Sequence, residues 1–305
     1  MSTSNALTST TGPTESTVDM GAGAAAKRAA PPARPLDPAG KAALARILRV
    51  NPKANPRAVA PDVSPNCIPR HIAFIMDGNG RWARDRGLPR LEGHKQGVEA
   101  ALRTLEACWA LGVEVVTLYS FSTDNWKRSD DEVQGLMALC VQQLPRESPK
   151  LRENNIRFRR LGRRSGLPDA VLAELDEAEA VTASCTGPTL CVAINYGARE
   201  ELVDAARSLA RAAASGEIDP GDISERHIAQ RLTTAGLPDP DLLIRTAGEY
   251  RVSNYLLWQI SYAELHVTPT RWPDFGHDGV VAAVRDFAQR QRRFGAEQPV
   301  APADR

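Results

Sequence analysis

The sequence lacks any apolar run long enough to cross a bilayer, so it predicts no membrane span. It also lacks an excess of one charge: the formal net charge is +1 over 305 residues, which gives no electrostatic case for binding nucleic acid. The first residues lack the basic start and apolar core of a secretory signal. We therefore expect a globular, cytoplasmic protein whose cationic functions come from local clusters.

Cysteines paired at metal-ligand spacing are absent as well. The five cysteines are odd in number, and most lie in apolar runs. This pattern is typical of reduced core thiols in a cytoplasmic protein rather than of a disulfide framework or a zinc site.

Large apolar residues are scarce at the N-terminus. Residues 1–65 are rich in Ser, Thr, Ala, Gly and Pro, which predicts a mostly disordered extension with one short helix at Pro38–Val50. A second polar stretch covers residues 296–305. We predict one folded domain over residues 66–295.

Within that domain, apolar strand-like runs alternate with amphipathic helix-like runs. The predicted strands are His71–Met76, Val113–Phe121, Ile156–Leu161, Thr189–Ile194, Asp241–Arg245 and Leu265–Thr268. The predicted helices are Gly93–Leu111, Asp130–Asn154, Pro168–Ser184, Arg199–Ser215, Ser224–Ala235 and Asp278–Arg293. Continuous apolar strands separated by helices indicate an α/β fold with a mainly parallel six-stranded sheet. Pro145 and Pro149 predict a kink or break in the second of these helices.

Polar clusters follow three of the predicted strands. Asp77 ends the first strand and leads into Gly78-Asn79-Gly80-Arg81, a turn whose backbone N–H groups suit phosphate. The turn matches neither a Walker loop nor a dinucleotide fingerprint, and plain turn chemistry remains an alternative. Since ligands of parallel sheets bind beyond the carboxyl ends of the strands, one site could collect all three clusters.

The second cluster runs from Arg245 to Asn254 and carries two arginines and Ser253, which suit phosphate oxygens. The third cluster runs from Ser122 to Arg128. Its Trp126 could close over an apolar ligand, or the segment could be a polar turn that caps the next helix. Glu264, an acid in an apolar run, is either a surface residue or a contact to metal or substrate.

The chain resembles the cis-prenyltransferases, in particular the bacterial undecaprenyl diphosphate synthases. The resemblance covers residues 70–295 in order and rests on HIAFIMDGNGRWA, Gly93-His94-Lys95, FSTDNW, INYGAR, IRTAGEYRVSN, LLWQISYAEL, RWPDF and a final RRFG. It implies an enzyme that condenses isopentenyl diphosphate with an allylic diphosphate, with farnesyl diphosphate as the expected starter, into a Z-polyprenyl diphosphate. It also implies Mg²⁺, a homodimer, an apolar tunnel and at most peripheral membrane association through the lipid product.

The resemblance implies a role for each matching residue. Asp77 and Glu264 would hold the metal, and Asn125 would handle a proton. The allylic diphosphate and its chain would contact Gly78, Asn79, Gly80, Arg81, Trp82, Arg90 and His94. The loop over the reacting groups would contribute Ser122, Thr123, Asp124, Trp126 and Arg128. The isopentenyl diphosphate would contact Arg245, Arg251, Val252 and Ser253, while Arg293 and Gly295 would reach a partner subunit's substrate.

The sequence departs from the family's pattern at several positions. Tyr250 stands where many bacterial members have histidine, Ala247 and Ala198 replace glycines, and Pro188 replaces a bulkier apolar residue at a position linked to product length. The aspartate-rich DDxxD pattern of the other prenyl synthases is absent. A synthase of shorter Z-prenyl chains and a non-catalytic partner subunit remain alternatives.

Overall fold

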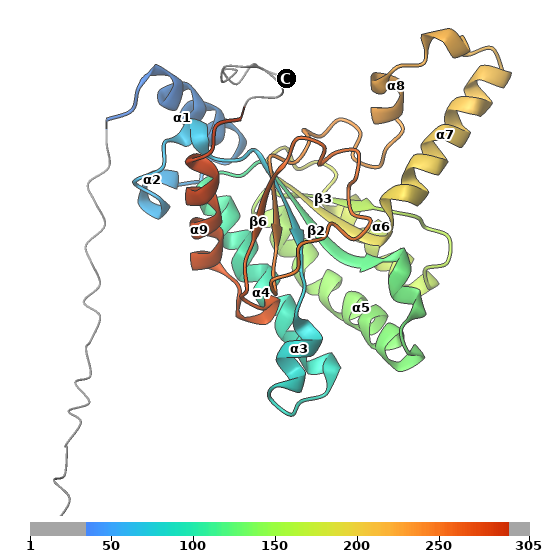
Figure 1. Ribbon diagram of the computed structural model, residues 1–305, viewed down its shortest axis with the longest axis horizontal. Coiled ribbons are helices and arrows are strands. Elements are labelled where there is room, and N and C mark those ends of the chain that lie inside the picture. The colour runs from blue at the N-terminus through green and yellow to red at the C-terminus, as the bar shows by residue number, and fades with distance from the viewer. Residues whose placement is uncertain (1–34, 293–305) are drawn as a thin grey trace, which may run out of the picture. The chain divides into compact units, whose positions relative to one another are not determined.

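A six-stranded parallel sheet forms the centre of the computed structural model, which describes residues 35–292 (Figure 1). The strands are β1 (His71–Ile75), β2 (Val115–Ser122), β3 (Arg157–Leu161), β4 (Thr189–Tyr196), β5 (Leu242–Arg245) and β6 (Glu264–Val267). Their order across the sheet is β3-β4-β2-β1-β5-β6, and every neighbouring pair is parallel. The predicted fold class and all six strands are confirmed, each end within two residues.

Helices connect the strands and cover the sheet. They are α1 (Pro38–Val50), α2 (Pro56–Val59), α3 (Asn79–Arg84), α4 (Arg90–Leu111), α5 (Asp130–Glu153), α6 (Asp169–Val181), α7 (Ala198–Ala214), α8 (Glu225–Ala229) and α9 (His277–Ala288). Short 3₁₀ turns occupy Pro65–Cys67, Thr123–Lys127, Pro220–Asp222 and Trp272–Asp274. None of the helices in residues 35–292 has the length and apolar character needed to cross a membrane.

Three of the predicted helices need correction. The helix expected at Asp278–Arg293 ends at Ala288. The helix expected at Ser224–Ala235 ends at Ala229, where turns take over. The kink or break expected from Pro145 and Pro149 does not interrupt α5, which is helical from Asp130 to Glu153.

The two faces of the sheet have separate cores. On one face, Phe74, Leu118 and Phe158 join side chains of α1, α4, α5, α6 and α9 in one cluster. On the other face, a smaller cluster contains Ala73 and Leu243, together with the start of α7 and the segment Val252–Ile260. Alternate residues of the inner strands therefore point to opposite cores, whereas the edge strand β6 contributes to neither cluster.

The folded unit begins well before residue 66, which corrects the predicted domain boundary. The predicted helix at Pro38–Val50 is present. Ile47, Ala54 and Val63 are buried within the same core cluster as the sheet. The remaining residues of the predicted extension, 1–34, and the predicted tail at 296–305 lie outside the described part.

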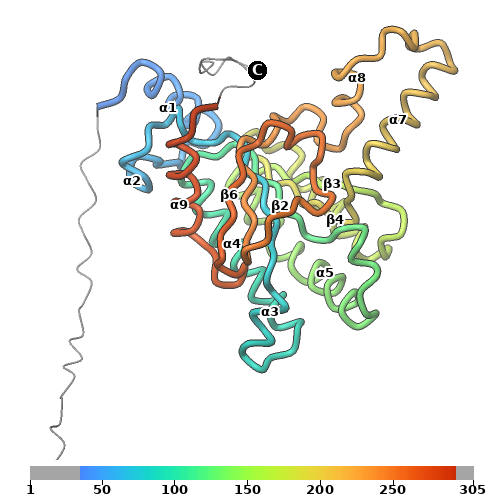
Figure 2. Tube along the Cα trace, viewed as in Figure 1, coloured from blue at the N-terminus to red at the C-terminus, as the bar shows by residue number. Residues whose placement is uncertain are grey.

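The carboxyl ends of the strands all reach one edge of the sheet. There β1 leads into α3 and β2 into the turn Thr123–Lys127. Figures 1 and 2 show α3 just beyond this edge, next to α4. The polar clusters that follow β1, β2 and β5 thus meet at this edge.

Candidate active site

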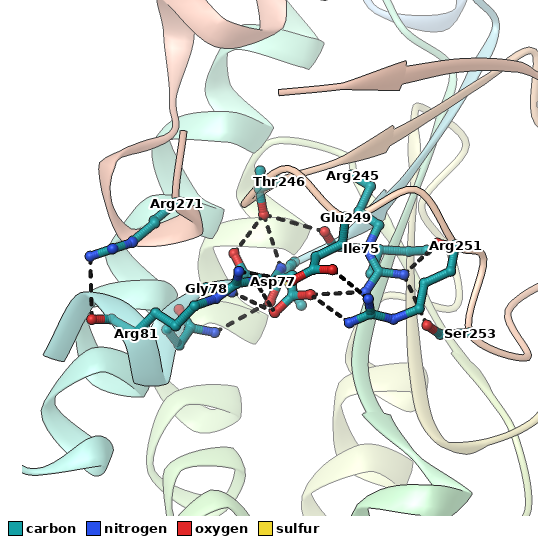
Figure 3. A network of polar contacts seen from close by, with 12 residues as sticks. Ile75, Asp77, Gly78, Arg81, Arg245, Thr246, Glu249, Arg251, Ser253 and Arg271 are labelled. Carbon is teal, nitrogen blue, oxygen red and sulfur yellow. Dashed lines mark hydrogen bonds and ion pairs between the residues drawn. The ribbon is translucent and has the colours of Figure 1, made fainter. Parts of the chain in front are cut away.

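Asp77 lies where the loops after β1 and β5 meet (Figure 3). Arg245, the last residue of β5, donates from Nη2 to Asp77 Oδ2 at 2.8 Å. The backbone reaches this point through Gly78, which has φ of 104° and acts as the N-cap of α3. A Cβ on Gly78 would lie 2.9 Å from the Cβ of Ala247, so only glycine lets the two loops approach this closely.

Thr246 joins the two loops through their backbones. Its hydroxyl accepts from Asp77 N at 2.9 Å and donates to Asp77 O at 2.7 Å. Thr246 is fully buried. The sequence identified this loop as a candidate site through Arg245. No sequence pattern predicted that Thr246 would form hydrogen bonds to the other loop.

Electrostatics keep Asp77 ionised. Burial is the largest single influence and raises the pKa of Asp77, but the hydrogen bond and charge of Arg245, with Gly78 N–H and Arg81, bring it below the ordinary carboxyl value. The carboxylate retains 27% of its side-chain exposure and faces the cavity described below. Asp77 therefore presents a charged carboxylate that a ligand or metal ion in the cavity can reach.

Arg245 also organises the second loop. Its Nη1 donates to Ser253 Oγ at 2.9 Å and to the backbone oxygen of Arg251. Arg251 itself lies 3.8 Å from Asp77 Oδ2 and pairs with Glu249 at 2.5 Å. Glu249 also pairs with Arg81 at 2.8 Å, so this residue, which the sequence did not single out, links the arginines of both loops.

A third group of cations converges on one carboxylate. Glu132, in the first turn of α5, lies 3.4 Å from Arg90, 3.3 Å from His94 and 2.8 Å from Arg128. Burial, and then the charge of Arg128, lower the pKa of His94, so its ring is neutral at pH 7. The Glu132 carboxylate lies among these three side chains, which shows that together they can bind an anion. Nothing in the sequence pointed to Glu132.

Asp77 and the cations around it line the mouth of an apolar cavity of about 920 Å³, whereas Thr246, Glu249 and Glu132 lie behind the lining. Leu102 and Leu105 of α4, Leu136 and Leu144 of α5, and Leu118 of β2 form its walls. The predicted tunnel is thus present, and its polar end lies at the carboxyl edge of the sheet. A volume of this size suits a long apolar ligand with a charged head.

The predicted site residues fall into three groups. Lining the cavity are Asp77, Gly78, Asn79, Gly80, Arg81, Arg90, His94, Ser122, Asp124, Asn125, Arg128, Arg245, Arg251 and Ser253. Trp82, Thr123, Trp126, Val252 and Glu264 are not among the lining residues. Arg293 and Gly295 lie outside the described residues.

The residues outside the lining have other contacts. Thr123 donates to Glu200 at 3.3 Å, and Val252 packs against the smaller core cluster. Trp82 donates to Asp274 at 2.7 Å and stacks with Arg86. Trp126 donates to Asn195 at 2.8 Å and packs on Phe121, so it does not close over the cavity.

Glu264 is the main departure from the expected site. It begins β6, pairs in register with Leu242, and binds Arg290 at 2.8 Å. That register places it level with Ile72, about 16 Å along the strands from Asp77 at ~3.3 Å per residue. A single chain therefore does not bring both carboxylates to one ion. Over the described residues, no group of three or more His, Cys, Asp or Glu side chains is arranged to hold a metal.

The parallel sheet and a charged mouth on an apolar cavity suit a protein that handles amphiphilic phosphates. Comparison with known proteins gives the family. A family model described as "Putative undecaprenyl diphosphate synthase" matches residues 75–295. The chain belongs to this family, the cis-prenyltransferases.

Individual relatives agree. An isoprenyl transferase of Heliobacterium mobile is 50% identical over 242 residues, covering 79% of this chain and 93% of the relative. A ditrans,polycis-undecaprenyl-diphosphate synthase of Vibrio parahaemolyticus, specific for (2E,6E)-farnesyl diphosphate, is 47% identical over 75% of this chain and 91% of its own. The crystal structure of lavandulyl diphosphate synthase from Lavandula x intermedia with dimethylallyl diphosphate has a TM-score of 0.73 and 35% identity, covering 75% of this chain and 99% of that one.

Proposed function

We propose that the protein condenses isopentenyl diphosphate with an allylic diphosphate, farnesyl diphosphate being the expected starter, into a long Z-polyprenyl diphosphate. The product would serve as precursor of the lipid carrier for cell-wall glycans. The observation that carries the proposal is the Asp77–Arg245 pair, which joins two phosphate-type loops at the mouth of a deep apolar cavity. Two such loops suit two diphosphates side by side, and the cavity suits the growing chain.

The allylic half belongs to the first loop and to α4. Backbone N–H groups at the start of α3, together with Arg81, Arg90 and His94, suit the oxygens of the allylic diphosphate. When the allylic C–O bond breaks, negative charge develops on this diphosphate, and the arginines stabilise it. His94 would contribute a hydrogen bond from its ring to these oxygens.

The isopentenyl half belongs to the second loop. Arg245, Arg251 and Ser253 would bind its diphosphate, and Asn125 would help to remove the proton after the new C–C bond forms. Asn125 Oδ1 accepts from Ser122 N at 3.0 Å, which holds the side chain at the cavity mouth.

Mg²⁺ fits Asp77. The ion prefers one or two carboxylates plus phosphate oxygens, and Asp77 offers an ionised carboxylate at the cavity. When bound there, Mg²⁺ would neutralise the charge that develops on the departing diphosphate. The proposal includes a homodimer, in which Arg293 and Gly295 would reach the partner's substrate, and cytoplasmic location with at most peripheral membrane contact through the product.

The experiment supplies radiolabelled isopentenyl diphosphate, farnesyl diphosphate and Mg²⁺ to the full chain and measures label in the organic extract. Mass spectrometry then gives the carbon count of the product. We expect Mg²⁺-dependent incorporation into a long chain. A short product would favour the shorter-chain synthase, and the absence of incorporation would leave the non-catalytic partner subunit.

A further inference from the structure

Charged side chains are unevenly distributed along the chain. Residues 38–60, which we call the basic segment, contain five Lys or Arg and no Asp or Glu. Their net charge is +5, whereas the whole chain has a net charge of +1. The cations are Lys41, Arg46, Arg49, Lys53 and Arg57. The segment covers α1 and α2, and it lies outside residues 75–295, which match the family model.

The helix α1 turns one face to the protein and the other to solvent. Its buried residues are Gly40, Ala43 and Ile47. Lys41, Leu48 and Arg49 are exposed, Leu48 to 39%. Leu48 and Arg49 lie seven and eight residues after Lys41, which is about two helical turns, so the three side chains share one face. This face combines two cations with one large apolar side chain.

The acidic side chains that flank the basic segment are already engaged. Asp37 accepts from a backbone N–H in the first turn of α1 at 2.7 Å and so caps that helix. Asp62 pairs with Arg285 at 2.8 Å. Glu114, next to the start of β2, pairs with Arg46 at 2.8 Å. These carboxylates therefore do not neutralise the exposed face of α1.

Several cations of the basic segment carry their charge at the surface. Within residues 35–292, the side chains of Lys41 and Arg49 make no hydrogen bond or ion pair. Lys53 Nζ donates to Asn154 Oδ1 at 3.0 Å, and this amide is a neutral acceptor. Lys41, Arg49 and Lys53 therefore present positive charge that suits an anionic partner.

Hydrogen bonds and packing hold the basic segment in place. Asn51 donates from Nδ2 to the backbone oxygen of Trp109 at 2.9 Å, and Asn55 N donates to the backbone oxygen of Ala110 at 2.8 Å. Both acceptors lie at the end of α4. The buried Ile47 belongs to the same core cluster as the sheet. The cations are thus presented from a folded surface.

We propose that the basic segment is a docking surface for an anionic lipid bilayer. Each Lys or Arg close to an anionic membrane strengthens binding, and a helix that carries several of them is typical of such contacts. Because the apolar face of α1 packs on the protein, the helix lies on the lipid headgroups rather than inserting among the acyl chains, and Leu48 adds an apolar contact.

The proposed function gives this surface a purpose, since a long polyprenyl diphosphate is insoluble in water and must pass to a membrane. Contact through the product would begin only after synthesis, whereas the basic segment would hold the chain at the bilayer beforehand. Figure 1 shows α1 and α3 at opposite ends of the strands. Docking through α1 would therefore leave the cavity mouth, next to α3, open to soluble diphosphates.

The test measures co-sedimentation of the full chain with phosphatidylcholine vesicles that contain or lack phosphatidylglycerol, in the absence of substrates and Mg²⁺. We expect binding only to vesicles with phosphatidylglycerol, and weaker binding as added salt screens the charges. Lys41→Gln with Arg49→Gln should weaken this binding by about 30-fold, since each cation near an anionic surface contributes roughly fivefold. Thermal unfolding checks that this double variant remains folded.

Arg207→Gln with Arg211→Gln is the matched control, because it removes the same charge from exposed positions of another helix. These two residues lie on α7, which begins in the core cluster on the opposite face of the sheet from that of α1. The control should bind anionic vesicles as the wild type does.

The absence of wild-type binding to phosphatidylglycerol vesicles overturns the proposal, and so does unchanged binding by Lys41→Gln with Arg49→Gln. Equal weakening by both double variants also overturns it, because net charge would then be the cause. If the first double variant does not fold, Arg49→Gln alone should weaken binding about fivefold, and unchanged binding overturns the proposal.

Nucleic acid is the competing polyanion. If duplex DNA at equal phosphate concentration displaces the chain from the vesicles, the assignment to lipid is wrong. Because vesicle binding is measured without substrates, its result does not depend on whether the chain makes a product. Failure of isopentenyl incorporation would contradict the proposed function alone.

Discussion

At the scale of single residues, the site depends on the ion pair between Arg245 and Asp77, of which only the arginine is fully buried. Arg245 is 4% exposed, and its partner Asp77 faces the cavity. Asp77 therefore has two tasks: it pairs a buried guanidinium, and it presents a carboxylate to the ligand. A substitution that keeps the hydrogen bond to Arg245 but removes the carboxylate charge distinguishes the structural role of Asp77 from its catalytic role.

Asp77→Asn is such a substitution, because the amide oxygen still accepts from Arg245. We expect turnover to fall by about 100-fold or more, since the carboxylate would hold the Mg²⁺ that neutralises the charge on the departing diphosphate. Isopentenyl incorporation measures the loss, and thermal unfolding checks that the variant remains folded. Wild-type turnover in Asp77→Asn would refute the role of the carboxylate.

The same pair gives a pH-dependent stability. The pKa of Asp77 is lowered in the folded protein, so its contribution is fully present above the unfolded value of about 3.9 and is lost as pH falls through the folded value. We expect urea unfolding to show a smaller loss of stability on acidification in Asp77→Asn than in the wild type. Parallel curves for the two proteins below pH 4 would contradict this.

The sequence predicted most residues at the mouth but not the contacts between them. Asp77 and Arg245 could be placed near each other because both end parallel strands. Glu132 and Thr246 could not, because their roles depend on how α5 and the β5 loop pack. Glu264 does not lie near Asp77 because the register of β6 places it at the other end of the strands. This register is set by packing that no local sequence pattern predicts.

At the scale of elements, two alanines stand where the family's pattern has glycine, with opposite consequences. Ala247 has φ of 67°, a left-handed conformation that disfavours a Cβ. Ala198 is the first residue of α7 and is not among the residues with positive φ. The sequence shows that both positions depart from the family's pattern, but only the backbone φ angles show that Ala247 is strained and Ala198 is not.

Ala247→Gly should therefore stabilise the protein by about 0.5–1 kcal/mol, because relief of strain exceeds the added freedom of the unfolded chain. Ala198→Gly, the matched control, should destabilise it by a similar amount, since the change removes a buried methyl group. Denaturant unfolding of both variants measures the difference. Destabilisation by both changes would show that Ala247 is not strained.

Close packing of α3 on α4 positions the phosphate-type turn. A Cβ on Gly93 would lie 2.1 Å from the backbone oxygen of Asn79, whereas a Cβ on Gly135 of α5 would meet only the side chain of Leu91, at 2.9 Å. Gly93→Ala should cost about 1–3 kcal/mol and raise the KM for the allylic diphosphate. Gly135→Ala should leave both nearly unchanged, and equal effects from the two changes would refute this account.

At the scale of the whole described unit, the fold could be predicted almost completely, except at its N-terminal boundary. Continuous apolar strands and amphipathic helices are strong patterns, and they gave the parallel sheet. The segment 35–65 has few large apolar residues, so its composition indicated disorder. Its order comes from a few buried side chains such as Ile47, which packs on the Gly112 turn, a long-range contact that composition cannot predict.

The central claim is that the two loops joined by Asp77 and Arg245 bind two different diphosphates for one condensation. The most direct measurement is incorporation of radiolabelled isopentenyl diphosphate by the full chain, with farnesyl diphosphate and Mg²⁺ each supplied or withheld. The account predicts organic-extractable label only when both are present, and its loss on chelation of the metal. Incorporation without the allylic partner or with the metal chelated, or none under any condition, would contradict it.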